Sequence, residues 1–426
     1  MKRNILVNTR KKKKLLCLGL AAAMLMTAGC GSGSNVNDSS SSDREPTSTS
    51  DASGGGFDEN SKDVKKKTAE IEEYIEQLYY FDVDDEKREE SYYDGIMEGL
   101  DDRYSVYYTK DEYEKLMEDD SGEFEGIGAT VSKNMDDGTI YVVKPLEDSP
   151  AEKAGLLPGD VIVRVDDMEL TTEMELDFVV EHIRGEKGTD VEIEVYREGE
   201  PDFLTFTVTR DKIETKTVAY EMLDNNIGYI QVEQFIENTP KLFKEAVDDL
   251  QGQGAKGIVI DLRDNPGGLV KAVIEMLDYI VDDEALADGA ESKGLLLQTK
   301  DKDDNVLETY SCEDGHSVNI PMTVIINGNS ASASEIFAGA FQDYNLGEVV
   351  GTTSYGKGIV QSIIKLSDGS AIKLTIAQYF RPSGEVVHKV GIEPDVVEEL
   401  NEDLKHQVTI EHDEDNQLQK AIDTLD

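Results

Sequence analysis

A serine and a lysine in the second half of the chain stand where attack on a carbonyl carbon needs a nucleophile and a base. Ser332 follows Met322–Ile326, an apolar and β-branched run that predicts a buried strand, and it precedes apolar residues at helical spacing. On such a strand-to-helix turn, backbone N–H groups and the positive end of the helix can stabilise an oxyanion. Lys357 lies between two glycines in a second turn. Because a lysine without its proton can deprotonate a serine, the pair predicts nucleophilic catalysis.

The segments around these two residues carry specific motifs. Ser332 is the central serine of an S-A-S-A-S-E run, and Lys357 is the lysine of a G-K-G turn. In this order, the motifs resemble the catalytic core of the C-terminal processing peptidases, also called tail-specific proteases. The resemblance implies Ser332 as nucleophile, Lys357 as general base and Gln361 as the residue that positions the lysine. By itself Ser332 would be a helix N-cap, and Ser330 and Ser334 are expected to be caps or supporting groups.

The segment D-L-R-D-N-P-G-G begins at Asp261, at the carboxyl end of a second predicted strand, where open α/β sheets bind ligands. It matches another motif of the same family. The resemblance implies that an N–H group of Gly267 or Gly268 joins that of Ala333 in an oxyanion hole, and it leaves the choice of glycine open. The alternative is a purely structural turn before the helix expected at 270–277.

Other pairs of nucleophile and base fit the sequence less well. A Ser-His-Asp triad needs one of the five histidines, and only His388 lies near the motifs quoted above. Cys312 is expected to be an unreactive thiol, since a cysteine protease needs a partnered histidine. A lysine base requires burial that lowers its pKa from about 10.4 by about three units. The apolar residues Ile359 and Val360 beside Lys357 favour such burial.

Residues 121–211 contain several predicted strands and the run S-P-A-E-K-A-G-L-L-P-G-D. This unit resembles a PDZ domain of the bacterial protease type. PDZ domains add an extended peptide to a sheet edge and hold its terminal carboxylate in a nest of backbone N–H groups. The resemblance places that nest at Gly126, Ile127, Gly128 and Ala129. Glycines at these positions would also suit a plain turn.

Arg184 follows a helix expected at 176–183 in the same unit. Two interpretations stay open for it. Its side chain either makes a polar contact that transmits peptide binding in the PDZ-like unit to the protease core, or is an ordinary surface group.

The N-terminal segment predicts export. A basic region precedes Leu15–Met26, an apolar stretch too short to span a bilayer but typical of a signal peptide. The next residues, T-A-G-C, end at Cys30 and resemble the lipobox of bacterial lipoproteins, with Thr27 where leucine is usual. We expect a lipidated Cys30 that anchors an extracytoplasmic protein through a flexible Ser/Gly-rich tether. Cleavage nearby without lipidation is the alternative.

The composition restricts the partners. The chain has 426 residues, with 90 acidic against 42 basic ones and a formal charge of −48, which opposes binding to nucleic acid. Neither a paired-histidine zinc motif nor an EF-hand is present in the sequence, so we expect no metal and no cofactor.

The resemblance implies polypeptide substrates bound by their C-termini. Helices expected within 61–120 mediate dimerisation in some family members, so a homodimer is an expectation here, as is an activating partner. The same region contains D-D-R-Y-S, in which Arg103 replaces the usual proline of the family.

The sequence therefore predicts an α/β (α+β) multidomain protein with a crotonase-like βαβ protease core, an inserted PDZ domain and an N-terminal helical segment. The expected function is that of an exported serine endopeptidase with a Ser-Lys dyad. The alternatives are a catalytically silent PDZ adaptor and a solute-binding lipoprotein. The expected parts are a signal peptide at 1–29, a tether at 30–60, a helical region at 61–120, the PDZ domain at 121–211, the protease core at 212–398 and an acidic segment at 399–426.

Overall fold

The computed structural model describes residues 58–135, 137–407 and 410–425, and the chain divides into two compact units between Asp82 and Val83. The signal peptide, Cys30 and most of the tether lie outside the described residues. In the first unit, α1 (Lys62–Leu78) begins where the Ser61 hydroxyl accepts a hydrogen bond from the backbone N–H of Val64. Within the described ranges, no helix has the length and apolar character that crossing a membrane requires.

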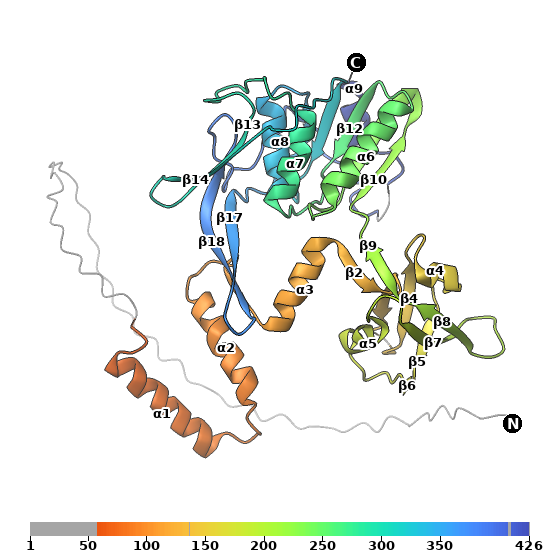
Figure 1. The fold of residues 1–426 in the computed structure, drawn as a ribbon, viewed down its shortest axis with the longest axis vertical. Coiled ribbons are helices and arrows are strands. Elements are labelled where there is room, and N and C mark those ends of the chain that lie inside the picture. The colour runs from red at the N-terminus through yellow and green to blue at the C-terminus, as the bar shows by residue number, and fades with distance from the viewer. Residues whose placement is uncertain (1–57, 136, 408–409, 426) are drawn as a thin grey trace, which may run out of the picture. The chain divides into compact units, whose positions relative to one another are not determined.

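The centre of the second unit is a six-stranded sheet covered by helices (Figure 1). Its strands are parallel, except that the edge strand β10 pairs antiparallel with β11. In spatial order they are β10 (Val218–Met222), β11 (Ile227–Val232), β12 (Gly257–Asp261), β15 (Met322–Ile326), β16 (Val349–Gly351) and β19 (Val396–Val397). A short 3-10 turn, η1 (Asp224–Asn226), connects the first two strands.

The central strands β11, β12, β15 and β16 are buried on both faces, which explains why they are apolar without alternation. Ile258 and Ile260 pack in one core with residues of the helices that follow β11, β12 and β15 in the chain. Val259 packs in a separate core with Leu418 of the last helix. The covering helices are α6 (Thr239–Gly252), α7 (Val270–Ile280), α8 (Ala333–Asp343) and α9 (Asn416–Asp423). The acidic C-terminal segment therefore contributes α9 to the packing of the central sheet.

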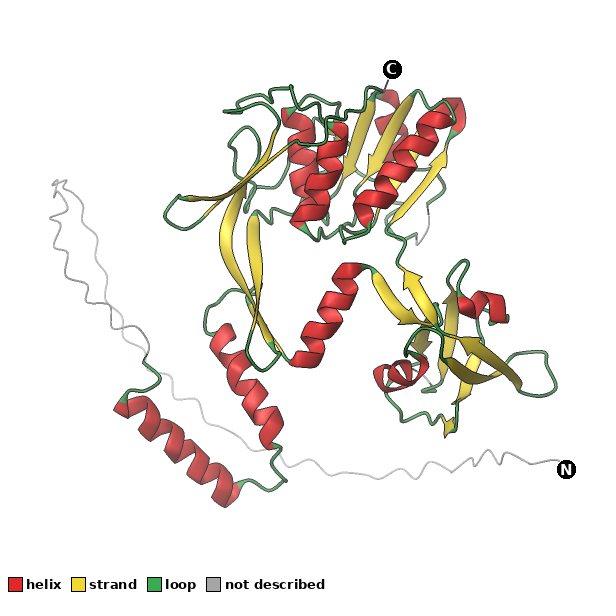
Figure 2. Cartoon of the chain, in the orientation of Figure 1, coloured by secondary structure: helices red, strands yellow, loops and turns green. Residues whose placement is uncertain are grey.

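A second, five-stranded sheet carries a long hairpin (Figure 2). The hairpin strands β17 and β18 pair antiparallel, and β18 also pairs with β1 from the N-terminal region and with β13. Its strands are β1 (Val106–Tyr108), β13 (Leu295–Lys300), β14 (Val306–Ser311), β17 (Ile359–Lys365) and β18 (Ala371–Phe380). The region expected to be helical does contain α2 (Asp85–Glu98) and α3 (Lys110–Ser121), but β1 lies between them and ties that region to the hairpin.

The PDZ-like unit has its own sheet and its own apolar core. The helix expected at 176–183 is present with those bounds. A two-stranded ribbon of β2 (Glu123–Gly126) and β9 (Asp211–Glu214) closes the unit at its chain ends. The other elements are β3 (Ala129–Lys133), β4 (Ile140–Pro145), α4 (Pro150–Ala154), β5 (Val161–Val165), β6 (Met168–Glu169), α5 (Leu176–Ile183), β7 (Asp190–Tyr196) and β8 (Leu204–Thr209).

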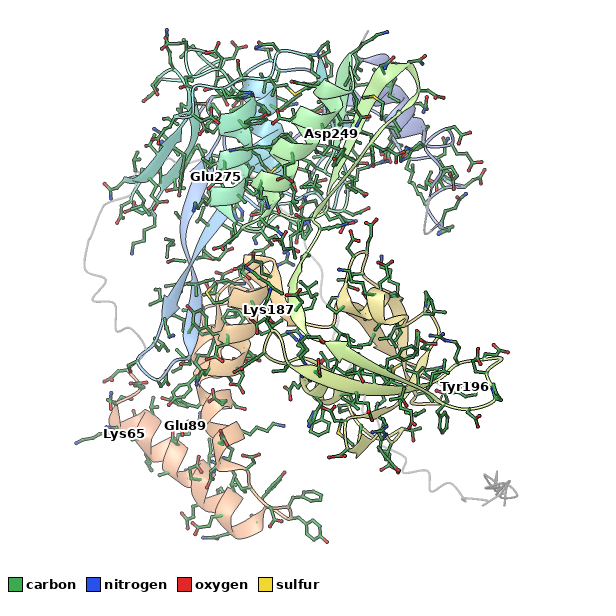
Figure 3. All side chains as sticks on the ribbon, turned by 45° about the vertical axis from the view of Figure 1, so that its right-hand side comes forward. Lys65, Glu89, Lys187, Tyr196, Asp249 and Glu275 are labelled. Atoms are coloured by element: carbon green, nitrogen blue, oxygen red, sulfur yellow. The ribbon has the colours of Figure 1, made fainter. Side chains whose placement is uncertain are left out.

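The predicted fold class is confirmed: the chain is a mixed α/β protein with a parallel βα core and an inserted strand-rich unit. Acidic side chains such as Asp249, labelled in Figure 3, are exposed on the surface. Exposed carboxylates of this kind contribute to the large negative charge, which repels other polyanions.

Candidate active site

Ser332 lies between β15 and α8 in a backbone conformation that is rare for serine. Its φ is 55° and its ψ is −112°, and it immediately precedes the first residue of α8. Its N–H donates to the carboxylate of Glu335 over 2.8 Å. Such a conformation costs of order 1–3 kcal/mol and persists only where the surroundings enforce it, as at active sites. The turn leaves the Ser332 side chain partly accessible at the N-terminus of a buried helix.

Lys357 lies in the turn before β17 and is partly buried. Burial lowers the pKa of its ammonium, and the positive charges of Lys373 and Arg103 lower it further, against the opposing effect of Glu335 and Asp102. Its Nζ atom lies 4.8 Å from the centre of the Tyr104 ring. Within the described part of the chain, no hydrogen bond joins Nζ to the Ser332 hydroxyl.

Glu335, in the first turn of α8, connects the serine turn to the lysine turn. Its side chain is fully buried. Besides the Ser332 N–H, its carboxylate accepts the N–H of Lys357 at 2.8 Å, the N–H of Gly356 at 2.6 Å and the hydroxyl of Ser354 at 2.5 Å. Glu335 is the last residue of the S-A-S-A-S-E run and was not among the predicted site residues. An acidic residue in the first turn of an otherwise apolar helix was the available signal.

Tyr379 of β18 forms a second connection between the same two turns. Its hydroxyl lies 2.9 Å from the carbonyl oxygen of Lys357 and 3.2 Å from that of Ser332. Burial raises the pKa of Tyr379 well above its usual value, so the phenol stays protonated and donates. Together, Glu335 and Tyr379 fix the backbones that carry the predicted nucleophile and base.

Gln361 lies near the start of β17, and its amide donates to the Thr375 hydroxyl over 3.3 Å. No hydrogen bond between Gln361 and Lys357 exists within the described residues. Ser332, Lys357 and Gln361 nevertheless line one cavity of about 540 Å³, together with Gly267 and Gly268. The structure thus brings the predicted catalytic residues together around a single space, with the amide of Gln361 turned to a different partner.

The two glycines proposed for the oxyanion hole differ in their hydrogen bonds. Gly267 is buried, and its N–H donates to the side chain of Asn265 over 2.8 Å. Gly268 is exposed to the cavity, and within the described ranges neither its N–H nor that of Ala333 has an acceptor. A Cβ atom at Gly267 would lie 2.8 Å from the Cβ of Ser332, so only glycine fits there. The free N–H groups therefore belong to Gly268 and Ala333.

The alternative nucleophile and base are not arranged for catalysis. His388 is absent from the residues that line the Ser332 cavity, although its backbone packs against Gly358. Its pKa is lowered by burial and by Lys389, and its buried Nδ1 has no partner within the described ranges. Burial and neighbouring carboxylates raise the pKa of Cys312 to about 12, which disfavours a reactive thiolate.

The predicted peptide site lies where β2 leads into β3. Gly126 ends β2, and Gly128 has a φ of 71°, which suits glycine. The carbonyl groups of Ile127 and Gly128 accept hydrogen bonds from Ala151 and Leu146, while their N–H groups have no acceptor within the described ranges. Ala129, the first residue of β3, completes the predicted site.

Arg184 lies directly after α5 and contacts groups outside the sheet of the PDZ-like unit. Its guanidinium pairs with Glu118 of α3 and lies 5.1 Å from the centre of the Phe124 ring of β2. The arginine is therefore placed between the unit and the helix that precedes it in the chain.

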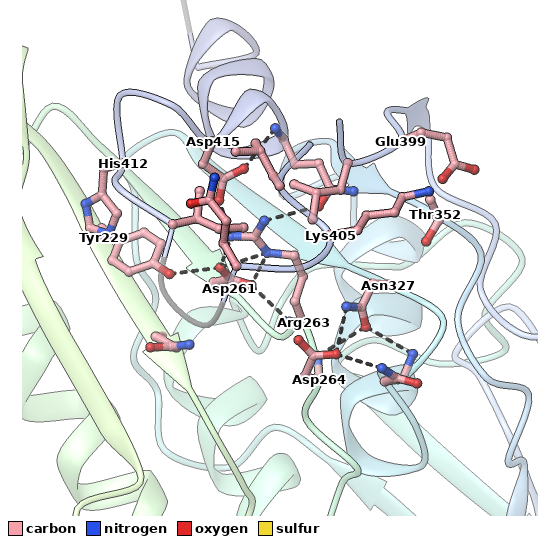
Figure 4. A pocket seen from close by; sticks show the side chains of 17 residues that line it. Tyr229, Asp261, Arg263, Asp264, Asn327, Thr352, Glu399, Lys405, His412 and Asp415 are labelled. Atoms are coloured by element: carbon pink, nitrogen blue, oxygen red, sulfur yellow. Dashed lines mark hydrogen bonds and ion pairs between the residues drawn. The ribbon is translucent and has the colours of Figure 1, made fainter. Parts of the chain in front are cut away.

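The D-L-R-D-N-P-G-G segment is anchored by an arginine that is largely, but not fully, buried (Figure 4). Arg263 pairs with Asp261 at 2.5 Å and with Asp415 at 2.7 Å, and these carboxylates raise the pKa of its guanidinium. Next to it, the Asp264 carboxylate accepts hydrogen bonds from the amides of Asn327 and Asn329. The C-terminal segment is thereby tied to the turn that leads to Gly267 and Gly268.

Comparison with known proteins identifies the family. Residues 226–398 match peptidase family S41, and residues 126–211 match a PDZ domain. The carboxy-terminal processing protease CtpA of Bacillus subtilis (strain 168) is 38% identical over 328 residues, covering 77% of this chain and 67% of that protein. The carboxy-terminal processing protease CtpB of the same organism is 38% identical over 328 residues, covering 76% of this chain and 65% of that protein.

Among solved structures, a photosystem II D1 C-terminal processing protease is 28% identical, covers 78% of this chain and 86% of that chain, and has a TM-score of 0.43. The chain spans about two thirds of the length of the Bacillus relatives. On the strength of the match to CtpA, the chain belongs to the carboxy-terminal processing proteases of peptidase family S41 and carries a PDZ domain.

Proposed function

We propose that this protein is a serine endopeptidase in which Ser332 and Lys357 form the catalytic dyad. The observation that carries the proposal is the single cavity lined by Ser332, Lys357 and Gln361, with the backbones of the first two held by Glu335. Loss of positive charge from a lysine requires desolvation, and the burial of Lys357 supplies it.

In the proposed reaction, the Ser332 hydroxyl attacks the scissile carbonyl while Lys357 accepts its proton. The N–H groups of Ala333 and Gly268 then stabilise the oxyanion. Lys357 gives the proton to the leaving amine as the peptide C–N bond breaks. Water, deprotonated by the same lysine, then attacks the acyl carbon, and Lys357 returns the proton to the Ser332 oxygen as the ester bond breaks. This sequence requires Nζ to move from the Tyr104 ring towards Ser332 when substrate binds, where Gln361 would orient it.

The substrate proposed for this site is a polypeptide delivered by its C-terminus. The free N–H groups of Ile127 and Gly128 support capture of a terminal carboxylate in the PDZ domain. Arg184, which contacts α3 through Glu118, is proposed to transmit occupancy of that domain towards the protease core.

Export, lipidation of Cys30 and a membrane-anchored location outside the cytoplasm belong to the same proposal and rest on the N-terminal sequence. A homodimer through the N-terminal helices is supported by the exposed apolar residues Ile71, Tyr74 and Leu78 of α1. An activating partner is consistent with a lysine that does not bond to its serine.

The experiment that tests the function uses the full chain and a loosely folded protein with an apolar C-terminus. Mass spectrometry of the products is expected to show internal cleavage, and a fluorophosphonate probe is expected to label Ser332. Binding of the protein without cleavage and without labelling, in the presence and absence of candidate partners, would instead establish the silent adaptor.

The pH dependence of cleavage is expected to follow the loss of the proton from Lys357. The neutral amine is the active form, so kcat/KM should rise as pH increases through the lowered pKa of Lys357 and then level off. Lys373→Gln removes a positive charge that lowers this pKa, so the rise should move to higher pH. Initial rates measured over a range of pH test this shift. Lys271→Gln on α7 is the control. An unchanged profile in Lys373→Gln would contradict the assignment of the base.

Removal of the substrate's terminal charge is expected to weaken binding. A substrate that ends in an amide should have a KM about tenfold higher, with little change in kcat, because charge-assisted hydrogen bonds to the PDZ domain are lost. Initial rates on matched substrates measure this, and an internal Glu→Gln substitution distant from both sites controls for total charge. Equal KM values would exclude recognition of the carboxylate.

A further inference from the structure

Arg103 lies beside the catalytic cavity, and none of the described residues forms an acidic partner for it. It is located between α2 and β1, in a loop fixed by Ser105, whose hydroxyl donates to Asp102 over 2.6 Å and accepts the N–H of Thr375 over 3.0 Å. Because Thr375 is on β18, the loop is held against the hairpin that follows Lys357. Arg103 is therefore positioned by the same elements as the predicted base.

Two tyrosines hold the guanidinium in place. Its Nη2 atom donates to the Tyr104 hydroxyl over 2.8 Å and to the Tyr355 hydroxyl, and its central carbon lies 4.8 Å and 5.6 Å from the two ring centres. Tyr355 belongs to the turn before Lys357, and its N–H donates to the carbonyl of Ser330. An arginine held between rings loses less side-chain freedom when it binds a ligand.

The guanidinium keeps donors available. The described part of this very acidic chain offers no carboxylate within ion-pair distance of Arg103, and only Nη2 is used in hydrogen bonds. Arg103 lines a cavity of about 460 Å³ whose wall also includes Ala331, Lys357 and Asp264. One oxygen of the Asp264 carboxylate accepts the amides of Asn327 and Asn329, as described above. The cavity thus presents an unpaired planar cation next to the reacting residues.

We propose that Arg103 is a specificity-determining residue that binds an acidic side chain of the substrate, close in sequence to the scissile bond. The proposal rests on the proposed protease function, because the subsite adjoins Ser332 and Lys357. A carboxylate matches the fork of N–H donors that arginine presents, and the contacts with the two tyrosines already restrict the guanidinium before it binds. A lysine at position 103 would supply the positive charge but not the planar pair of N–H donors of a guanidinium.

A substrate carboxylate bound by Arg103 would also change the pKa of Lys357. The pKa of Lys357 is lowered by the charges of Lys373 and Arg103 and raised by those of Glu335 and Asp102. Three further carboxylates line the same two cavities as the lysine: Asp264, Asp120 and Glu308. A substrate carboxylate that pairs with Arg103 cancels one of the two positive charges that lower the pKa of Lys357. Cleavage of an acidic substrate is therefore expected to rise at higher pH than cleavage of its neutral counterpart.

The test compares reporter proteins that share one C-terminus, so that the PDZ domain contributes equally. A single Glu or Gln is placed in turn at each position around the cleavage site. With the full chain, Glu is expected to exceed Gln in kcat/KM by about tenfold at one position. Arg103→Gln should reduce that ratio to about one while still cleaving the Gln reporter, and Arg103→Lys should keep part of it.

Lys373→Gln is the matched control, because it removes the other cation near Lys357 but not the proposed subsite. It should shift the pH profile and retain the preference for Glu. Binding of the same peptides to the Ser332→Ala variant, with and without Arg103→Gln, gives a readout that needs no chemistry. If parent and Arg103→Gln show the same Glu to Gln ratio in rate and in binding, Arg103 is not a specificity residue. Absence of cleavage in the parent, with Arg103-dependent binding of Glu, would overturn the protease function and leave the acidic subsite standing.

Discussion

Replacing Ser332 by alanine is expected to lower kcat/KM for protein cleavage by roughly 10⁴- to 10⁶-fold, as loss of a catalytic serine does elsewhere. The remaining groups would still bind substrate, but none of them can form the acyl-enzyme. Cleavage of a loosely folded protein, followed by gel and mass spectrometry, measures the effect. Residual cleavage of more than about one part in a hundred would show that another group is the nucleophile.

The same substitution should leave stability almost unchanged, because among the described residues no side-chain hydrogen bond of the Ser332 hydroxyl caps α8. Ser330→Ala is the informative comparison. The Ser330 hydroxyl donates to the carbonyl of Leu262 over 2.7 Å and accepts the N–H of Asn327 over 2.9 Å. Its loss should lower the free energy of unfolding by about 1–3 kcal/mol through an unsatisfied buried group. Denaturant unfolding of both variants separates the catalytic serine from the structural one.

Replacing Glu335 by alanine is expected to reduce both stability and activity. The buried carboxylate accepts four donors, three backbone N–H groups and the Ser354 hydroxyl. Each orphaned buried donor costs about 1–3 kcal/mol, part of which water entering the space would recover, so we expect a loss of about 3–5 kcal/mol in all. Because the turns of Ser332 and Lys357 would no longer be tied together, activity should fall by at least about 10²-fold. Denaturant unfolding and initial rates measure the two effects.

Glu335→Gln sharpens this test. The amide has nearly the shape of the carboxylate, but its NH₂ group faces backbone N–H donors and cannot accept from them. It should therefore retain the packing and still lose most of the activity. Glu245→Gln on the exposed face of α6 is the matched control and should change neither quantity. Full activity in Glu335→Gln would mean that the carboxylate is not needed to position the serine and lysine turns.

The sequence by itself determined the class of fold, because its strands and helices are specified by local patterns. The run at Met322–Ile326 is apolar throughout, as a strand buried on both faces must be, and the structure contains β15 with those bounds. The helix expected at Leu176–Ile183 is likewise present with those bounds. Specific motifs identified the family, and they named Ser332, Lys357 and Gln361, whose roles stay predictions.

Only the tertiary structure decided how these residues are held. The bonds from Glu335 to the turn of Lys357 join segments far apart in sequence, and no local pattern encodes such contacts. The same is true of β1, which pairs with β18, and of α9, which covers the central sheet and places Asp415 on Arg263. In the sequence, Arg103 is notable only because it stands where the family usually has proline. Only the fold brings Arg103 beside Lys357 and shows that no carboxylate of the described residues pairs with it, because the partners of a charged group depend on its three-dimensional surroundings.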